Sequence, residues 1–166
     1  MPKLSAGLLM YRCGAAGLEV FLVHPGGPFW KNKDRGAWSI PKGEVSEGED
    51  LLKRARVEFE EEIGQSPPAD PAVYSDLGEI KQKSGKIVHA WAFEGDWNGE
   101  LRCGTFAKIE WPPRSGKMLR VPEVDIAGFF PPDQAKEKIN PAQVELIARL
   151  EKLTSGRRRR SLTKRS

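Results

Sequence analysis

Three glutamates near the end of a predicted helix have the types and the spacing of a cation-binding patch. Glu58, Glu61 and Glu62 stand at positions i, i+3 and i+4, so their carboxylates share one side of a helix, while Glu60 points towards solvent. Like charges at this spacing repel, and acids near the last turn also meet the negative end of the helix dipole. A divalent cation relieves both penalties, and carboxylate oxygens are preferred ligands of Mg²⁺ and Mn²⁺. A solvated acidic helix face is the commoner structure for such a run.

The segment before this helix favours a site over a plain charged surface. It reads Pro41-Lys42-Gly43-Glu44, in which the glycine allows close approach of the backbone and the lysine supplies a positive charge. A helix is expected over residues 49–63, with Ser46 as N-cap and Glu49 completing a capping box. Gly64 is the expected C-cap. This arrangement of glycine turn, lysine and carboxylate helix is typical of a phosphate-binding enzyme.

The spacing of these residues resembles the Nudix box. Gly43 is followed after five residues by Glu49, and eight residues later the chain reads Glu58-Phe59-Glu60-Glu61-Glu62-Ile63-Gly64. Two positions depart from the family pattern, because Val57 stands where the family has arginine and Gln65 where it has an apolar residue. The family arginine orients the acidic residues. Arg54, four residues before Glu58, is placed to substitute for it in part.

The resemblance implies both a fold and an activity. The fold is α/β, a Nudix-type α/β/α sandwich with a mixed β-sheet, and the activity is hydrolysis of a pyrophosphate bond in a nucleoside or dinucleoside polyphosphate. The segment from Trp38 to Gly43, which leads into the motif, is similar to the corresponding segment of members that act on dinucleoside polyphosphates. The implied cofactor is Mg²⁺ or Mn²⁺, held by Glu58, Glu61 and Glu62, which are also the expected catalytic carboxylates, with the backbone carbonyl near Gly43 as a further ligand.

Two other functions are consistent with the sequence. Because Val57 replaces the family arginine, the protein is also consistent with a non-catalytic, Nudix-like module that binds a nucleotide. The run Arg157 to Arg160 allows, more weakly, a member that binds or decaps RNA through its tail.

Further candidate residues lie outside the box. Glu110 and Glu123 flank the end of a predicted strand, and each is a candidate general base, although an exposed structural carboxylate is the more common role for either alone. Four residues are candidates for binding the substrate, as phosphate-binding cations or as a surface on which a base stacks: Lys42, Arg35, Trp38 and Arg114. Trp30 is a second tryptophan close to the expected site, and core packing is the simpler role for Trp38.

The remaining elements follow from hydrophobic patterning. Strands are expected at 4–12, 18–24, 73–82, 87–94, 105–111 and 125–130, and two further helices at 133–139 and 141–153. A loop rich in Gly, Pro and Lys is expected at 25–36 and a Pro/Gly-rich loop after residue 111. We expect one Nudix domain over residues 1–154 and a disordered basic tail over 155–166.

Charge and cysteine content restrict the classes of function that the sequence allows. The formal net charge is +4, but residues 157–166 hold six Lys/Arg and no acid, which leaves 21 basic and 23 acidic residues elsewhere. The body of the chain is therefore not a basic nucleic-acid surface. Two cysteines make no disulfide framework, and the chain has neither a long apolar run nor a signal-peptide pattern. We expect a cytoplasmic protein whose partner is a small-molecule nucleotide, with no membrane contact and with nucleic acid possible only through the tail.

Overall fold

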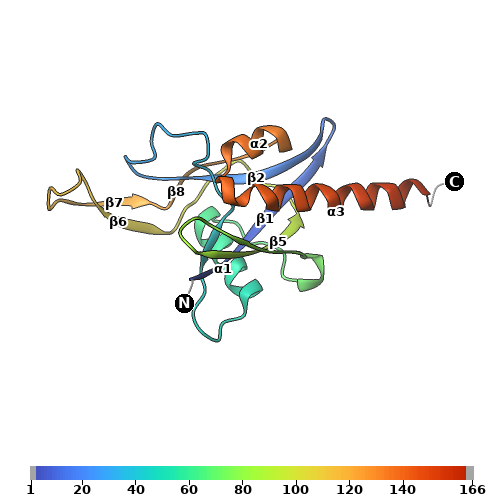
Figure 1. Cartoon of the computed structure of the whole chain (residues 1–166), viewed down its shortest axis with the longest axis horizontal. Coiled ribbons are helices and arrows are strands. Elements are labelled where there is room, and N and C mark those ends of the chain that lie inside the picture. Colours follow the sequence, from blue (N-terminus) through green and yellow to red (C-terminus); the bar gives the residue numbers. More distant parts are fainter. Residues whose placement is uncertain (1–2, 164–166) are drawn as a thin grey trace.

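A mixed six-stranded sheet forms the centre of the molecule in the computed structural model, which describes residues 3–163 and the side chains of residues 3–156 (Figure 1). Its strands are β1 (Leu4–Gly14), β2 (Gly17–Pro25), β3 (Lys42–Glu44), β4 (Ser75–Lys81), β5 (Ile87–Glu94) and β8 (Val124–Phe130). The order is β4-β5-β1-β2-β8, and β3 pairs with β1 beside the end that β2 leaves free. Only β1 and β5 are parallel, and the other pairs are antiparallel.

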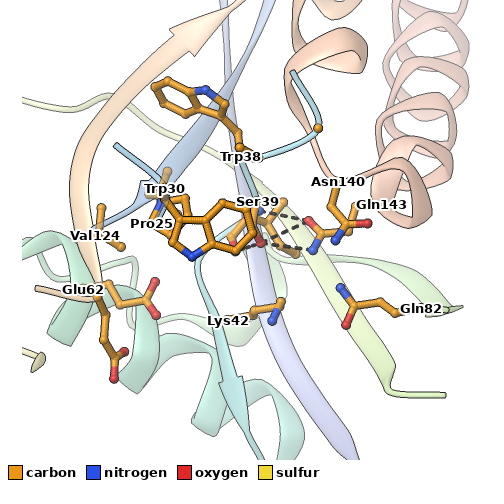
Figure 2. Close-up of a pocket in the computed structure, with 15 residues that line it drawn as sticks. Pro25, Trp30, Trp38, Ser39, Lys42, Glu62, Gln82, Val124, Asn140 and Gln143 are labelled. Carbon is orange, nitrogen blue, oxygen red and sulfur yellow. Dashed lines mark hydrogen bonds between the residues drawn. The ribbon is translucent and has the colours of Figure 1, made fainter. Parts of the chain in front are cut away.

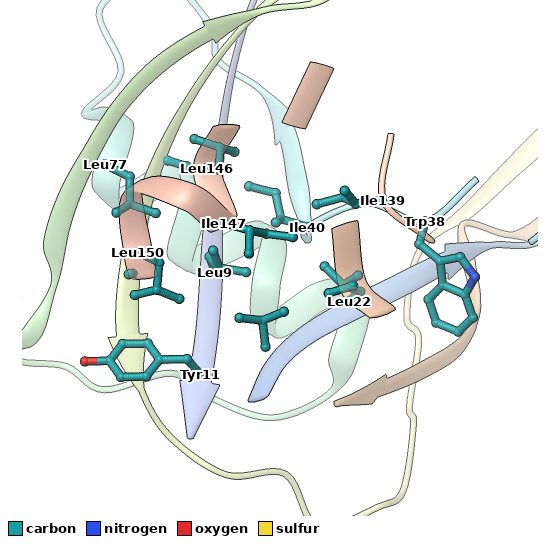
Figure 3. Packing of buried hydrophobic residues seen from close by; sticks show 14 of the residues in the cluster. Leu9, Tyr11, Leu22, Trp38, Ile40, Leu77, Ile139, Leu146, Ile147 and Leu150 are labelled. Atoms are coloured by element: carbon teal, nitrogen blue, oxygen red, sulfur yellow. The ribbon is translucent and has the colours of Figure 1, made fainter. Parts of the chain in front are cut away.

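Helices cover both faces of this sheet. They are α1 (Leu51–Ile63), α2 (Pro132–Lys138) and α3 (Val144–Thr163), with 3₁₀ turns at Pro71–Val73 and Pro141–Gln143. Side chains of β1 alternate between two cores: Leu8 and Met10 pack in the α1 core, and Leu9 packs in the α2/α3 core. Figure 3 shows the second core, in which Leu146 and Leu150 of α3 lie over the sheet. The predicted α/β/α sandwich with a mixed sheet is confirmed.

A two-stranded ribbon stands apart from the main sheet, and half of it was not predicted. β6 (Phe106–Glu110) pairs antiparallel with β7 (Met118–Pro122), and Figure 1 shows the ribbon projecting from the body. The expected strand at 105–111 corresponds to β6. The segment of β7 was expected to belong to the Pro/Gly-rich loop after residue 111, and in the structure its residues Met118 to Arg120 are exposed.

The start of α1 differs from the sequence prediction. Its N-cap is Asp50, whose side chain accepts a hydrogen bond from the amide of Leu52, and not Ser46. Gly48 has a φ of 82°, which a right-handed helix does not allow, so the helix begins after it. Half of the expected capping box survives as a local turn, since the amide of Ser46 donates to Glu49 at 2.7 Å. Gly64 caps the other end as predicted, with a φ of 81°.

The last helix is longer than predicted. α3 continues to Thr163, through a segment expected to be a disordered tail from residue 155. Arginine is a good helix former, and this intrinsic preference was outweighed in the prediction by the lack of apolar side chains. The side chains of Arg157 to Arg160, on which the RNA hypothesis depends, lie outside the described residues. No helix in the described range 3–163 is long and apolar enough to cross a membrane.

Candidate active site

The glutamates of α1 lie where the sequence placed them, with unequal exposure. Glu62 is buried, Glu58 is partly buried and Glu61 is exposed. Glu60 lies on another side of the helix, where it accepts a hydrogen bond from the hydroxyl of Ser66 at 2.9 Å. The three carboxylates therefore differ in exposure, from the buried Glu62 to the exposed Glu61.

Strand β3 brings the glycine of the motif against this patch. Gly43 pairs with Ala6 of β1, which fixes its position beside α1. A Cβ at Gly43 would overlap the carboxyl group of Glu58, so no other residue fits there without moving that glutamate. Glycine at this position therefore lets the Glu58 carboxylate lie against the backbone, as the motif implies.

Glu58 and Glu62 lie in surroundings that disfavour their ionised forms. Burial, reinforced by the charges of Glu58 and Glu123, raises the pKa of Glu62 to about 9. Burial and the charge of Glu61 also raise the pKa of Glu58. The last turn of α1 holds no basic residue that would favour the ionised forms.

These groups fit a divalent cation by their chemistry. Within residues 3–156, no three Asp, Glu, His or Cys side chains are already gathered around one metal position. The donor set is nevertheless the oxygen set that Mg²⁺ and Mn²⁺ prefer. Burial is the largest cause of the raised pKa values of Glu58 and Glu62, and the charges of neighbouring carboxylates add to it. A cation bound among these oxygens favours their ionised forms.

Arg54 occupies part of the role of the family arginine, whose position in this chain is taken by Val57. Its Nε and Nη2 donate to Oε2 of Glu49 at 2.9 and 2.6 Å, and its Nη1 donates to Oε1 of Glu58 at 3.3 Å. The guanidinium therefore links the first glutamate of the motif to the carboxylate patch. This is the partial substitution that the sequence suggested.

Replacing Arg54 is expected to lower activity more than stability. Because the Arg54 side chain is 27% exposed, its ion pairs contribute less than about 1 kcal/mol to the free energy of unfolding. Because Arg54 positions Glu58, its removal is expected to lower cation affinity or turnover by roughly 10–100-fold. We expect Arg54→Ala to lose this factor in a Mn²⁺ titration and in kcat. Lys53→Ala, the exposed neighbour, is the control.

A second substitution distinguishes loss of Glu58 positioning from a general loss of structure. Adding Val57→Arg to the Arg54→Ala variant restores the family pattern and is expected to recover most of the lost cation affinity. An Arg54→Ala variant with wild-type affinity and turnover would show that Arg54 does not orient Glu58.

A cavity of about 320 Å³ opens beside the carboxylate patch. Figure 2 shows Glu62 on the α1 side of it, Asn140 and Gln143 on the opposite side, and Trp30 between them. Lys42 and Gln82 also line the cavity (Figure 2). The cavity therefore combines an aromatic wall, amide side chains, the amino group of Lys42 and the buried carboxyl group of Glu62.

Lys42 is the basic residue of this cavity. Burial lowers its pKa, and the charge of Lys86 acts in the same direction, while Glu62 opposes the shift. None of the ion pairs found among residues 3–156 involves Lys42. A partly buried lysine without a close carboxylate partner is suited to a phosphate oxygen.

Gln143 lines the cavity, although the sequence analysis did not identify it as a candidate. The buried Gln143 accepts a hydrogen bond from the Ile40 amide at 3.1 Å, and its Nε2 donates to the Ser39 hydroxyl at 3.0 Å. Figure 2 draws these bonds between the start of the last helical region and the segment that leads to Lys42. The partners are more than 100 positions apart in sequence, so no local pattern indicated the contact.

The loop that carries Trp30 is anchored by His24. The Nδ1 of His24 lies 2.8 Å from Oδ1 of Asp125, and its Nε2 lies 2.6 Å from the carbonyl oxygen of Lys33. Trp38 is packed between His24 and Phe130. Trp38 lines the cavity, but it is only 6% exposed, so most of its ring surface serves core packing.

The structure brings some of the other candidate residues to the site and leaves others away from it. Glu123 lines the cavity with Glu62 and influences its pKa. Glu110 ends β6, where it accepts a hydrogen bond from the Gly116 amide at 3.3 Å, and it does not line this cavity. Arg114 lies in the exposed turn of the ribbon, and Arg35 lines a separate depression beside α2.

The comparison with protein families decides the classification. Residues 1–150 match the model of the NUDIX domain. The chain belongs to the Nudix family. No curated protein matches its sequence.

Solved Nudix structures share the fold at low sequence identity. A C. elegans Ap4A hydrolase in a binary complex is 18% identical, with a TM-score of 0.63 over 92% of this chain and 98% of that one. The NUDIX domain of Shewanella oneidensis NrtR, in complex with ADP ribose, is 15% identical, with a TM-score of 0.64 over 93% and 89%. The MutT protein of Methanosarcina mazei Go1 is 17% identical, with a TM-score of 0.57 over 92% and 96%. Membership of this family indicates a pyrophosphohydrolase.

Proposed function

We propose that this Nudix protein hydrolyses a pyrophosphate bond of a nucleoside or dinucleoside polyphosphate with Mg²⁺ or Mn²⁺ as cofactor. The observation that carries the proposal is the buried carboxylate of Glu62, which faces a cavity beside Glu58 and Glu123 without a neutralising ion pair among the described residues. Such a group is costly to retain for stability alone, and its perturbed pKa is typical of a functional site.

Each side chain has a role in this proposal. Glu58, Glu61 and Glu62, with the backbone carbonyl near Gly43, hold the cation, which when bound neutralises phosphate charge and favours attack by water. Lys42 binds a phosphate oxygen, and the ring of Trp30 receives a base. Glu123 lies beside Glu62 and accepts a proton from the attacking water. We favour Glu123 over Glu110 as general base because Glu110 lies outside this cavity.

A panel of nucleotides tests the proposal. Nucleoside triphosphates, nucleoside diphosphate sugars and dinucleoside polyphosphates are incubated with the protein and with Mg²⁺, Mn²⁺ or EDTA, and the products are separated by chromatography. Cleavage at a phosphoanhydride, abolished by EDTA, is expected for at least one class. Tight calorimetric binding of a nucleotide without any product after hours would instead identify a non-catalytic binding module.

A further inference from the structure

His24, near the end of β2, is a buried histidine that faces an acceptor at both ring nitrogens. The residue is 3% exposed. Its Nδ1 lies 2.8 Å from Oδ1 of Asp125, and its Nε2 lies 2.6 Å from the carbonyl oxygen of Lys33. An ionised carboxylate and a carbonyl oxygen can only accept hydrogen bonds. Both ring nitrogens therefore donate, which requires two protons on the ring and so the imidazolium form of His24.

The charged groups around His24 are arranged in favour of a positive ring. Asp125 of β8 contacts the ring directly. On the loop after β2, hydrogen bonding to Lys138 of α2 is the main cause of the lowered pKa of Asp34, and the positive charge of His24 adds to it. The nearby cations have other partners, because Lys138 donates to Asp34 at 2.9 Å and the ammonium of Lys33 lies over an aromatic ring of its own loop.

Lys33 connects His24 to Trp30 through the backbone. Its carbonyl oxygen faces His24, while its amide donates to the carbonyl oxygen of Trp30 at 2.9 Å. The amide of Trp30 in turn donates to Gly27 at 3.3 Å, so residues 27–33 form consecutive turns. In the part of the chain that the structure describes, residues 28–32 make no hydrogen bond outside this loop. The bond from His24 therefore ties the turns of Trp30 to the central sheet.

We propose that His24 is a positioning residue for Trp30 and acts only in its imidazolium form. With both protons in place, the ring holds the turns so that Trp30 lines the cavity beside Glu62 (Figure 2). When one proton passes to solvent, the other stays towards Asp125, because a hydrogen bond to a carboxylate is the stronger one. The bare Nε2 then repels the carbonyl oxygen of Lys33 that faces it.

Trp30 is therefore released from the cavity as the pH rises, and ligand affinity falls with it. The effect on ligand affinity rests on the proposed function, which places a base on Trp30. The change in the position of Trp30 itself does not rest on it, so the two can be tested separately.

A pH titration of the wild-type protein by NMR tests the positioning of Trp30 without any ligand. The chain holds five tryptophans and two histidines, so signals are assigned by single substitutions. Protein labelled with 5-fluorotryptophan gives a ¹⁹F signal for Trp30, identified by its loss in Trp30→Phe. Histidine labelled with ¹⁵N reports the protons on each ring nitrogen. The Trp30 signal is expected to shift or broaden over the same pH interval in which Nε2 of His24 loses its proton while Nδ1 keeps its own.

Two substitutions of His24 separate its two hydrogen bonds. His24→Gln places an amide nitrogen near the position of Nε2 and keeps the donor to Lys33, whereas His24→Asn places one near Nδ1 and keeps only the donor to Asp125. Both variants lack the charge and the titration of the ring. We expect His24→Gln to show the low-pH signal of Trp30 at every pH and His24→Asn to show the high-pH signal.

His89→Gln is the matched control. His89 is the other histidine of the chain, and its ring stacks on Trp91 with ring centroids 4.2 Å apart. Its replacement is expected to leave the pH transition of Trp30 unchanged. The thermal midpoint of each variant is measured to confirm folding, and the titration of the wild-type protein needs no variant of His24 at all.

Calorimetry with a methylene-bridged, non-hydrolysable ATP analogue and Mg²⁺ measures the effect on ligand affinity. His24→Asn is expected to bind the analogue roughly tenfold more weakly than His24→Gln at the same pH, since a buried carbonyl group has lost its donor. The two variants share the same glutamates and the same loss of charge. A comparison at one pH therefore removes the titration of Glu58 and Glu62 from the difference.

Several outcomes overturn the proposal. A Trp30 signal that does not follow the ring of His24, a ring that keeps both protons until the protein unfolds, or equal Trp30 signals in the glutamine and asparagine variants each contradicts the positioning role. Equal affinities of these two variants for the analogue contradict the effect on ligand binding. Failure of the proposed function has a different result, in which the Trp30 signals behave as expected but no nucleotide is cleaved.

Discussion

Glu61→Gln is expected to lower the kcat for phosphoanhydride hydrolysis by about 100-fold or more while the protein stays folded. Glu61 is exposed, so the amide costs no packing, and the change removes one negative charge and one oxygen donor from the carboxylate patch. The charge stabilisation that a bound cation supplies is worth several kcal/mol, and each 1.36 kcal/mol is about tenfold in rate. The measurement is a steady-state rate at saturating substrate over a range of Mg²⁺ concentrations.

Glu60→Gln is the matched control for this variant. Glu60 is the adjacent glutamate of the same helix, and its side chain contacts Ser66 on another side. We expect Glu60→Gln to keep kcat within about twofold of the wild-type value, since charges away from the site have small effects. A Glu61→Gln variant as active as Glu60→Gln would refute the role of Glu61 as a cation ligand.

Glu62→Gln is expected to stabilise the cation-free protein at pH 8 while abolishing most of its activity. The pKa of Glu62 is about 9 in the folded protein against an ordinary value of 4.5. The folded state therefore holds a proton that the unfolded state releases, so the stability from this group is fully present below pH 4.5 and falls as the pH rises towards 9. Glutamine resembles the protonated acid and does not titrate, so it removes this loss.

The effect has a size and a pH dependence that can be measured. In EDTA at pH 8, we expect Glu62→Gln to raise the free energy of unfolding by on the order of 2 kcal/mol and the thermal midpoint by about 5 °C. At pH 5 the two proteins should have nearly equal midpoints. Mg²⁺ is expected to raise the midpoint of the wild-type protein more than that of the variant. A variant less stable than wild type at both pH values would show that Glu62 is a packing residue without a charge penalty.

The sequence was sufficient for the features that depend on local spacing. The shared side of Glu58, Glu61 and Glu62 follows from helix periodicity, and the close approach of Gly43 follows from a motif in which only glycine fits. Arg54 was identifiable because it lies one helical turn before Glu58. The apolar residues at 4–12 likewise predicted a strand, which corresponds to β1.

Features that depend on distant partners were not predictable from the sequence. Gln143 supports Ile40 across 103 positions, and the ribbon strand β7 is defined by its pairing with β6 rather than by its own composition. A cavity of about 510 Å³ lies between that ribbon and the loop of Trp30, and its walls come from segments far apart in the sequence. Ser46 was a reasonable N-cap by residue type, but the positive φ of Gly48 moves the helix start to Asp50.

Direct observation of the cation is the most decisive measurement. Crystals grown with Mn²⁺ and a methylene-bridged dinucleoside polyphosphate are measured at a wavelength where manganese scatters anomalously. We predict an anomalous peak coordinated by carboxylate oxygens of Glu58, Glu61 or Glu62 and by a phosphate oxygen of the ligand. A well-ordered ligand with no anomalous peak beside these carboxylates would contradict the account.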